Sequence, residues 1–157
     1  MNDNTASNAQ AVTKVNVYFN FRSPYCYLAS KSMFSVVDQY RVKFLWKPFG
    51  GWAGRSSPER VKKKIHLVRQ DVARSCKKMG VPFSPPPIET DPTLAGAVSF
   101  AAEKEGLLKP YIIEVMRQEW AEGRNIGEID TLFEIFWGNE RIDSLKDHLH
   151  DLRLRNI

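Results

Sequence analysis

Residues 23–26, Ser-Pro-Tyr-Cys, lie where a strand-like run gives way to a helix-like run. Apolar and polar residues alternate from Val15 to Phe21, which is the period of a strand. Apolar residues then recur at helical spacing as far as Tyr40. Ser23 is therefore the expected N-cap, with Pro24 as the first helical residue. This arrangement puts a hydroxyl and a thiol at the amino end of a helix, where free N–H groups and the dipole stabilise a thiolate.

The serine at position 23 has a chemical consequence. Thioredoxin-type redox proteins carry a Cys-x-x-Cys pair at this point, whereas this chain has Ser-x-x-Cys. The pattern favours binding and activating the thiol of another molecule over dithiol chemistry. Cys26 and Cys76 are the two cysteines of the chain, so no disulfide framework is expected, and a reducing cytoplasm suits this content.

Composition narrows the class of protein. The 157 residues, 43% of them hydrophobic and 26% charged, are typical of one globular domain. No apolar run reaches the roughly 20 residues needed to cross a bilayer. Residues 1–14 are expected to form a flexible tail, because the start is polar and lacks the features of a secretory signal. The net charge of +5 favours anionic partners but is too scattered to indicate nucleic acid.

The rest of the chain predicts an α/β architecture. A second strand is expected over 42–48, and strand, helix and strand in succession indicate a parallel βαβ unit. Three helices are expected next, near 57–80, 91–106 and 109–123, followed by a strand at 131–137 and a helix at 143–153. We therefore expect a thioredoxin-like core from 15–54 and 130–157, with a helical subdomain inserted at 55–129.

Several segments in this order resemble a known family. Residues 17–29, Val-Tyr-Phe-Asn-Phe-Arg-Ser-Pro-Tyr-Cys-Tyr-Leu-Ala, resemble the start of the 2-hydroxychromene-2-carboxylate isomerases and the kappa-class glutathione transferases. Both belong to the DsbA-like branch of the thioredoxin superfamily. Residues 71–74 with 80–83, 120–126 and 136–141 resemble later parts of the same family. The resemblance extends from about residue 15 to the end, and its specificity lies in the order of the motifs.

The resemblance implies a glutathione site. Its catalytic serine stands at Ser23, which on local sequence alone would be read as an ordinary N-cap. There it would donate a hydrogen bond to the glutathione sulfur and lower the pKa of that thiol. The other residues that the resemblance places at glutathione are Pro24, Lys64, Asn139 and Glu140.

Three further residues are candidates for the site. Cys26 is either a small buried residue or the redox centre of a mixed-disulfide reaction. Tyr25, and Trp52 on the glycine-rich loop 50–54, could line a pocket for an aromatic substrate. No metal site is expected, because the sequence has no zinc spacing and the pair His148-x-His150 diverges on a helix.

One departure from the family puts the glutathione site in question. The family carries a Val-Pro-Thr segment with a cis proline that faces the active site. Here residues 129–130 run almost directly into the expected strand 131–137. Its backbone would pair with the cysteine of glutathione, so we expect either that residues are missing from this chain or that the site is broken.

The resemblance implies a glutathione-dependent isomerase of a conjugated aromatic pyruvate. It further implies a homodimer that acts on a small anionic aromatic substrate. The cysteine content favours the cytoplasm, and the charge and hydropathy patterns indicate neither nucleic acid nor a membrane as a partner. Three alternatives remain open: a kappa-like transferase, a Cys26-based DsbA-like thiol-disulfide oxidoreductase, and a non-catalytic interaction domain that keeps the scaffold.

Overall fold

The computed structural model of the chain describes residues 11–50 and 58–155. Its sheet has two strands among these residues, β1 (Thr13–Phe19) and β2 (Val42–Pro48). They pair in parallel, with Thr13 opposite Val42 and Phe19 opposite Pro48. The expected parallel pairing is confirmed, although β1 begins at Thr13, inside the expected tail. The tail's residues 1–10 lie outside the described residues.

Two short helices connect the strands where the sequence predicted one. α1 (Pro24–Ser30) and α2 (Ser35–Gln39) are separated by turns at 31–34. Serine hydroxyls account for this break, because Ser30 donates to the Tyr27 carbonyl and Ser35 to the Ser32 carbonyl, each at 2.7 Å. Such local hydrogen bonds compete with a continuous helix. The prediction of a single helix through Tyr40 is therefore wrong, and the helix behind Ser23 has two turns.

Three longer helices follow as the sequence predicted. They are α3 (Pro58–Met79), α4 (Thr93–Lys104) and α5 (Leu108–Trp120). Each is followed by a glycine with a positive φ: Gly80 at 67°, Gly106 at 75° and Gly123 at 71°. Glycine adopts this left-handed conformation without the penalty that a Cβ brings, which is why these residues end the helices.

The predicted strand at 131–137 is wrong, because this segment forms α6 (Ile129–Trp137). Thr131, Leu132, Ile135 and Phe136 are buried, whereas Glu134 and Trp137 are exposed. The buried residues form two adjacent pairs, and the second pair follows the first by four positions, so all four lie on one face of a helix. β-Branched and aromatic residues favoured a strand, but a short run that is apolar at nearly every position fits either structure.

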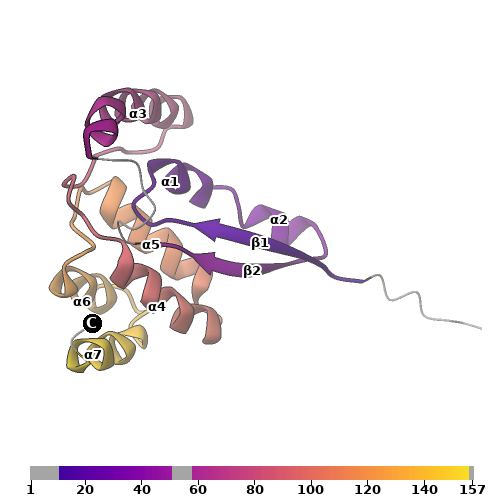
Figure 1. The fold of residues 1–157 in the computed structure, drawn as a ribbon. Helices are drawn as coiled ribbons and strands as arrows, with labels where there is room; N and C mark the ends of the chain where they lie inside the picture. The colour runs from indigo at the N-terminus through magenta and orange to yellow at the C-terminus, as the bar shows by residue number, and fades with distance from the viewer. Residues whose placement is uncertain (1–10, 51–57, 156–157) are drawn as a thin grey trace, which may run out of the picture.

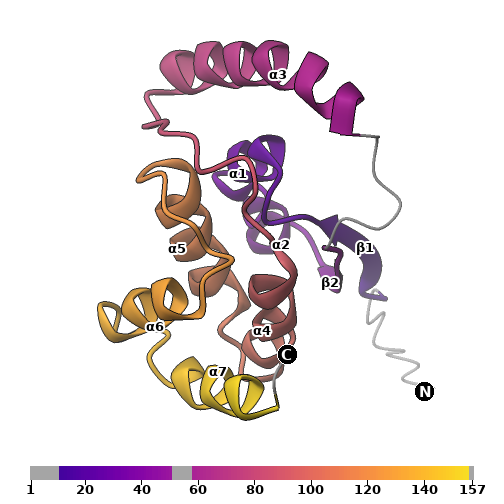
Figure 2. The ribbon, with the colours of Figure 1, turned by 60° about the vertical axis from the view of Figure 1, so that its left-hand side comes forward.

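The chain ends in α7 (Leu145–Leu154), which agrees with the predicted final helix. Figures 1 and 2 show α4 and α5 in the middle of the molecule, with α1 and α3 on one side and α6 and α7 on the other. The buried residues Leu145 and Leu149 pack α7 into the core. At the surface, His148 contacts Glu105 after α4, and Arg153 lies 3.6 Å from Asp130 on α6. The C-terminal residues thus form a helical layer rather than further strands of the sheet.

An aromatic cluster joins the sheet to the helices. The rings of Phe19 and Trp46 lie 5.1 Å apart, and the ring of Phe21 lies 5.7 Å from Tyr111 on α5. On the strands, Phe19 and Trp46 are buried while Tyr18 and Lys47 beside them are exposed. The helices therefore cover one face of the sheet, and the core places the end of β1 against α5. No helix among the described residues is long and apolar enough to cross a membrane.

Candidate functional site

Ser23 lies in the turn between β1 and α1 and is the N-cap of α1. The turn is fixed by Asn20, whose side-chain oxygen accepts from the Arg22 N–H at 2.9 Å and whose carbonyl accepts from the Ser23 N–H at 3.0 Å. The Ser23 hydroxyl oxygen accepts from the Cys26 N–H at 3.4 Å. Among the described residues no acceptor takes the hydroxyl hydrogen of Ser23. A hydroxyl is one donor as well as an acceptor, so this half-buried group can donate to a ligand.

Two contacts hold the turn in place from behind. The Trp120 indole N–H donates to the Phe21 carbonyl at 3.2 Å, which ties the turn to the end of α5. The Arg22 guanidinium donates to the Ile88 carbonyl in the connector between α3 and α4. The backbone before Ser23 is therefore anchored on two elements that are distant in sequence.

Tyr25 joins α1 to the helical subdomain. Its hydroxyl donates to the Asp71 carboxylate on α3 at 2.9 Å, and the Tyr25 side chain stays 48% exposed. The hydrogen bond to Asp71, then burial and the negative charge of Asp71, raise the pKa of Tyr25. The same Asp71 also pairs with Arg74, at 3.6 Å. Tyr25 therefore lies two residues after Ser23 and remains accessible, and its role as a pocket residue stays a prediction.

Replacing Tyr25 with phenylalanine tests this link. We expect the free energy of unfolding to fall by about 0.5–1 kcal/mol at neutral pH, because an exposed hydrogen bond contributes little. The raised folded-state pKa means that the contribution is complete below the unfolded value of about 10 and is lost as pH rises through the folded value. Denaturant unfolding at pH 7 and above pH 10 measures both effects. Tyr18→Phe, at an exposed tyrosine on β1, is the control, and equal losses in the two variants at pH 7 would contradict the link.

Lys64 lies on α3, where its side chain is exposed. It precedes Asp71 by two helical turns, so both residues are on one face of α3 about 10 Å apart along the axis. Because Asp71 meets Tyr25, Lys64 shares the face of α3 that is turned toward the Ser23 side of the molecule. Its predicted contact with the glycine carboxylate of glutathione stays a prediction.

The two cysteines differ in environment. Cys26 is half-buried in the first turn of α1, whereas Cys76 on α3 is buried. Burial raises the pKa of the Cys76 thiol, with a smaller opposing effect of Lys31. A buried thiol of raised pKa is a poor nucleophile, so Cys76 is not a candidate for the site.

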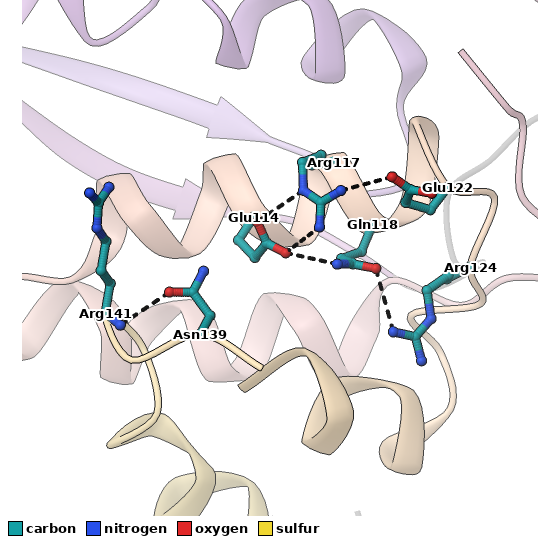
Figure 3. A network of polar contacts seen from close by, with 7 residues as sticks. All are labelled: Glu114, Arg117, Gln118, Glu122, Arg124, Asn139 and Arg141. Atoms are coloured by element: carbon teal, nitrogen blue, oxygen red, sulfur yellow. Dashed lines mark hydrogen bonds and ion pairs between the residues drawn. The ribbon is translucent and has the colours of Figure 1, made fainter. Parts of the chain in front are cut away.

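Asn139 and Glu140 lie in the segment between α6 and α7. Figure 2 shows these two helices separated by α4 and α5 from α1, the helix that follows Ser23. Figure 3 shows Asn139 turned toward Arg141, whose N–H it accepts at 3.1 Å, apart from the network around Arg117. In this structure they are not brought together with Ser23. Their predicted role stays untested, and Trp52, the other pocket candidate, lies outside the described residues.

A shallow groove of about 300 Å³ lies between α2, β2 and the start of α5. Its lining includes Phe34, Val37, Phe44 and Leu108, and it includes no residue of the turn 20–26. It is therefore not part of the Ser23 site. No cluster of side chains in 11–50 and 58–155 could hold a metal ion.

Sequence reasoning missed three residues that shape the site. The role of Asn20 in the turn could have been predicted, because an asparagine at the end of a strand often accepts a hydrogen bond from the backbone N–H two residues later. The burial of Glu119 could have been predicted, because it lies on the same apolar face of α5 as Tyr111 and Val115. The contact of Asp71 with Tyr25 could not be predicted, since nothing local connects Asp71 to a tyrosine 46 residues away.

This geometry, a Ser-x-x-Cys turn between a parallel strand and a helix, agrees with the family comparison. Residues 14–136 match the family model described as a DSBA-like thioredoxin domain. The chain belongs to the DsbA-like thioredoxin family. The family resemblance seen in the sequence is thereby confirmed at the level of the superfamily, together with the thioredoxin-like α/β fold. No curated protein sequence matches this DsbA-like chain.

Solved structures share the fold of this DsbA-like protein. A 2-hydroxychromene-2-carboxylate isomerase aligns with a TM-score of 0.66 and 19% identity, over 88% of this chain and 71% of its own. The cytosolic disulfide reductase DsbM from Pseudomonas aeruginosa aligns with a TM-score of 0.59 and 21% identity, over 91% and 78%. The structure of the same DsbM with GSH aligns with a TM-score of 0.56 and 21% identity, over 91% of this chain and 79% of its own. These likenesses establish a common fold that includes both an isomerase and a reductase.

Proposed function

We propose that this DsbA-like protein binds glutathione and that Ser23 stabilises its thiolate during isomerisation of a conjugated aromatic pyruvate. The observation that carries the proposal is the Ser23 hydroxyl, whose hydrogen has no acceptor among the described residues while its oxygen accepts from Cys26. A donor of this kind stabilises an anionic sulfur. The DsbM structure solved with GSH supports glutathione as the thiol.

The proposed reaction needs no net oxidation. The glutathione thiolate adds to the double bond of the conjugated acid, which leaves a single bond about which rotation is fast. Elimination then restores the double bond in the rearranged product and releases the thiolate. Ser23 would hold the sulfur as an anion before addition and after elimination, and the protein would keep thiolate and substrate in reacting position.

Lys64 is the proposed partner of the glycine carboxylate, since it faces the Tyr25 side of α3. Pro24 and Tyr25 border the proposed sulfur position, and the accessible ring of Tyr25 suits a planar aromatic acid. The fold likeness to a cytosolic reductase supports a reducing cytoplasm as the compartment. Homodimer formation belongs to the same proposal. The segment between α6 and α7 lies beyond α4 and α5, so its position does not favour the predicted contact of Asn139 and Glu140 with the γ-glutamyl end.

Calorimetric titration of reduced glutathione into the full chain tests the proposal. We expect saturable binding with one molecule per chain, stronger above neutral pH, where more of the glutathione is thiolate. Oxidised glutathione, which has no free thiol, is the matched control ligand. If reduced glutathione does not bind, the proposal is wrong.

A Cys26-based oxidoreductase is the second candidate. It is favoured by the half-buried Cys26 in the first turn of α1 and by the fold likeness to a disulfide reductase. In that reaction the Cys26 thiolate would attack a disulfide, form a mixed disulfide with one half and release the other half as a thiol. Reduction of a glutathione mixed disulfide distinguishes the two, because only this candidate requires Cys26→Ser to abolish activity.

Two further candidate functions remain. A kappa-like transferase shares the thiolate step and would release the conjugate instead of the rearranged acid, which product analysis distinguishes. A non-catalytic interaction domain would bind neither glutathione nor a conjugated acid. The two-stranded sheet, which lacks a segment equivalent to the family's cis-proline strand among the described residues, is the observation that favours it.

A further inference from the structure

Glu119 is an acid in the core of α5. It follows Tyr111 and Val115 at four-residue steps on the buried stripe of the helix, and its relative exposure is 0%. Neither carboxyl oxygen of Glu119 has a hydrogen-bond partner among the described residues. The Trp120 indole N–H, which could have served, donates to the Phe21 carbonyl.

A carboxyl group in this position stays neutral. Burying an unpaired carboxylate costs several kcal/mol, so such a group keeps its proton instead. Burial raises the pKa of Glu119 well above its ordinary value, and Trp120 and the positive charge of Arg22 oppose this shift only in part. Burial without a hydrogen-bond partner therefore favours the protonated, uncharged form of Glu119.

Contacts of its neighbours place Glu119 behind the Ser23 turn. Trp120, the next residue, holds the Phe21 carbonyl, two positions before Ser23. Arg22, the residue before Ser23, is the cation whose charge acts on Glu119. The end of α5 thus contacts the turn through the hydrogen bond from Trp120 to Phe21.

Other charged groups near this end of α5 are engaged elsewhere. Arg117 pairs with Glu114 and Glu122, each at 2.8 Å, as Figure 3 shows. Asp91, before α4, accepts from the N–H and hydroxyl of Thr93, and Glu134 on α6 pairs with Arg124. Arg22 is itself held by the Ile88 carbonyl, and an ionised Glu119 would compete for its positive charge.

We propose that Glu119 is a positioning residue of the Ser23 site, which stays protonated so that no negative charge stands behind the bound thiolate. This inference rests on the proposed function. An ionised Glu119 would repel the thiolate and would draw Arg22 away from the Ile88 carbonyl, which anchors the turn. Both effects weaken thiolate binding once the pH is high enough to ionise Glu119.

Glutathione affinity as a function of pH in the full chain, compared between wild type and Glu119→Gln, tests the inference. In the wild type the affinity should rise with thiolate formation and then fall about tenfold as Glu119 ionises, the usual effect of a neighbouring like charge. In Glu119→Gln the affinity should rise without the later fall. Glu119→Leu is a second neutral variant in case the glutamine folds poorly, and Glu103→Gln, at an exposed acid of α4, is the control. Identical profiles for wild type and the neutral variants overturn the inference.

Unfolding of the same proteins gives a readout that needs no glutathione. A raised folded-state pKa makes the stability from Glu119 complete below the unfolded value of about 4.3 and progressively lost as pH rises toward the folded value. The unfolding equilibrium constant of the wild type, relative to Glu119→Gln, should therefore rise about tenfold per pH unit in this window. Parallel stability curves overturn the inference about Glu119 alone. A wild type that binds no glutathione at any pH overturns both the proposed function and this inference, whatever the stability curves show.

Discussion

Replacing Phe136 with alanine is expected to lower the free energy of unfolding by about 3–5 kcal/mol. Phe136 has a relative exposure of 0%, and its ring lies 6.0 Å from the ring of Tyr111 on α5. Truncation therefore removes a buried aromatic side chain and leaves a cavity at the junction of α5 and α6. Denaturant unfolding monitored by circular dichroism measures the loss.

Trp137→Ala is the matched control, because the neighbouring Trp137 is 71% exposed and contacts the ring of Phe133 at 5.7 Å. We expect a loss of about 1 kcal/mol or less. The pair of variants tests which side of α6 faces the core. A larger loss for Trp137→Ala than for Phe136→Ala would contradict α6.

Replacing Ser23 with alanine is expected to weaken binding of the glutathione thiolate about 10- to 100-fold. The estimate is that of one hydrogen bond to a charged group, about 1.5–3 kcal/mol. Cys26→Ser should change the affinity by no more than a few-fold, since the proposed site does not use the Cys26 thiol. Titration calorimetry above neutral pH measures both variants. A large loss for Cys26→Ser together with a tolerated Ser23→Ala would favour the oxidoreductase instead.

Ser23→Ala also removes the N-cap of α1, which costs about 1 kcal/mol of stability. Two further variants separate this effect from ligand binding. Ser23→Thr keeps a capping hydroxyl and should retain much of the affinity. Ser23→Gly costs only a few tenths of a kcal/mol as a cap yet lacks the donor, so its affinity should fall as far as that of alanine.

Local rules predicted the parts of the site that depend on neighbouring residues. Ser23 and Pro24 form the cap as expected, because capping depends on residues that are adjacent in sequence. The helix ends at Gly80, Gly106 and Gly123 followed from the conformational freedom of glycine. The parallel pairing of the strands followed from the order of strand, helix and strand.

The remaining features depend on tertiary contacts. α6 was read as a strand because its intrinsic preferences are ambiguous, and packing against α5 and α7 decides its structure. The contact of Tyr25 with Asp71 and the isolation of Glu119 involve segments brought together by the fold. The resemblance gave roles to Asn139 and Glu140, but a helical layer replaces the expected strand before them, and they lie away from Ser23.

Titration of the bound glutathione thiol is the most direct test of whether Ser23 stabilises the thiolate. Thiolate absorbance in the ultraviolet, followed against pH with the full chain in excess, reports the pKa of that thiol in the wild type and in Ser23→Ala. We expect the pKa to fall from about 8.5 or above toward neutrality in the wild type and to return to the free value in Ser23→Ala. A bound thiol that titrates like free glutathione in the wild type would contradict the role of Ser23.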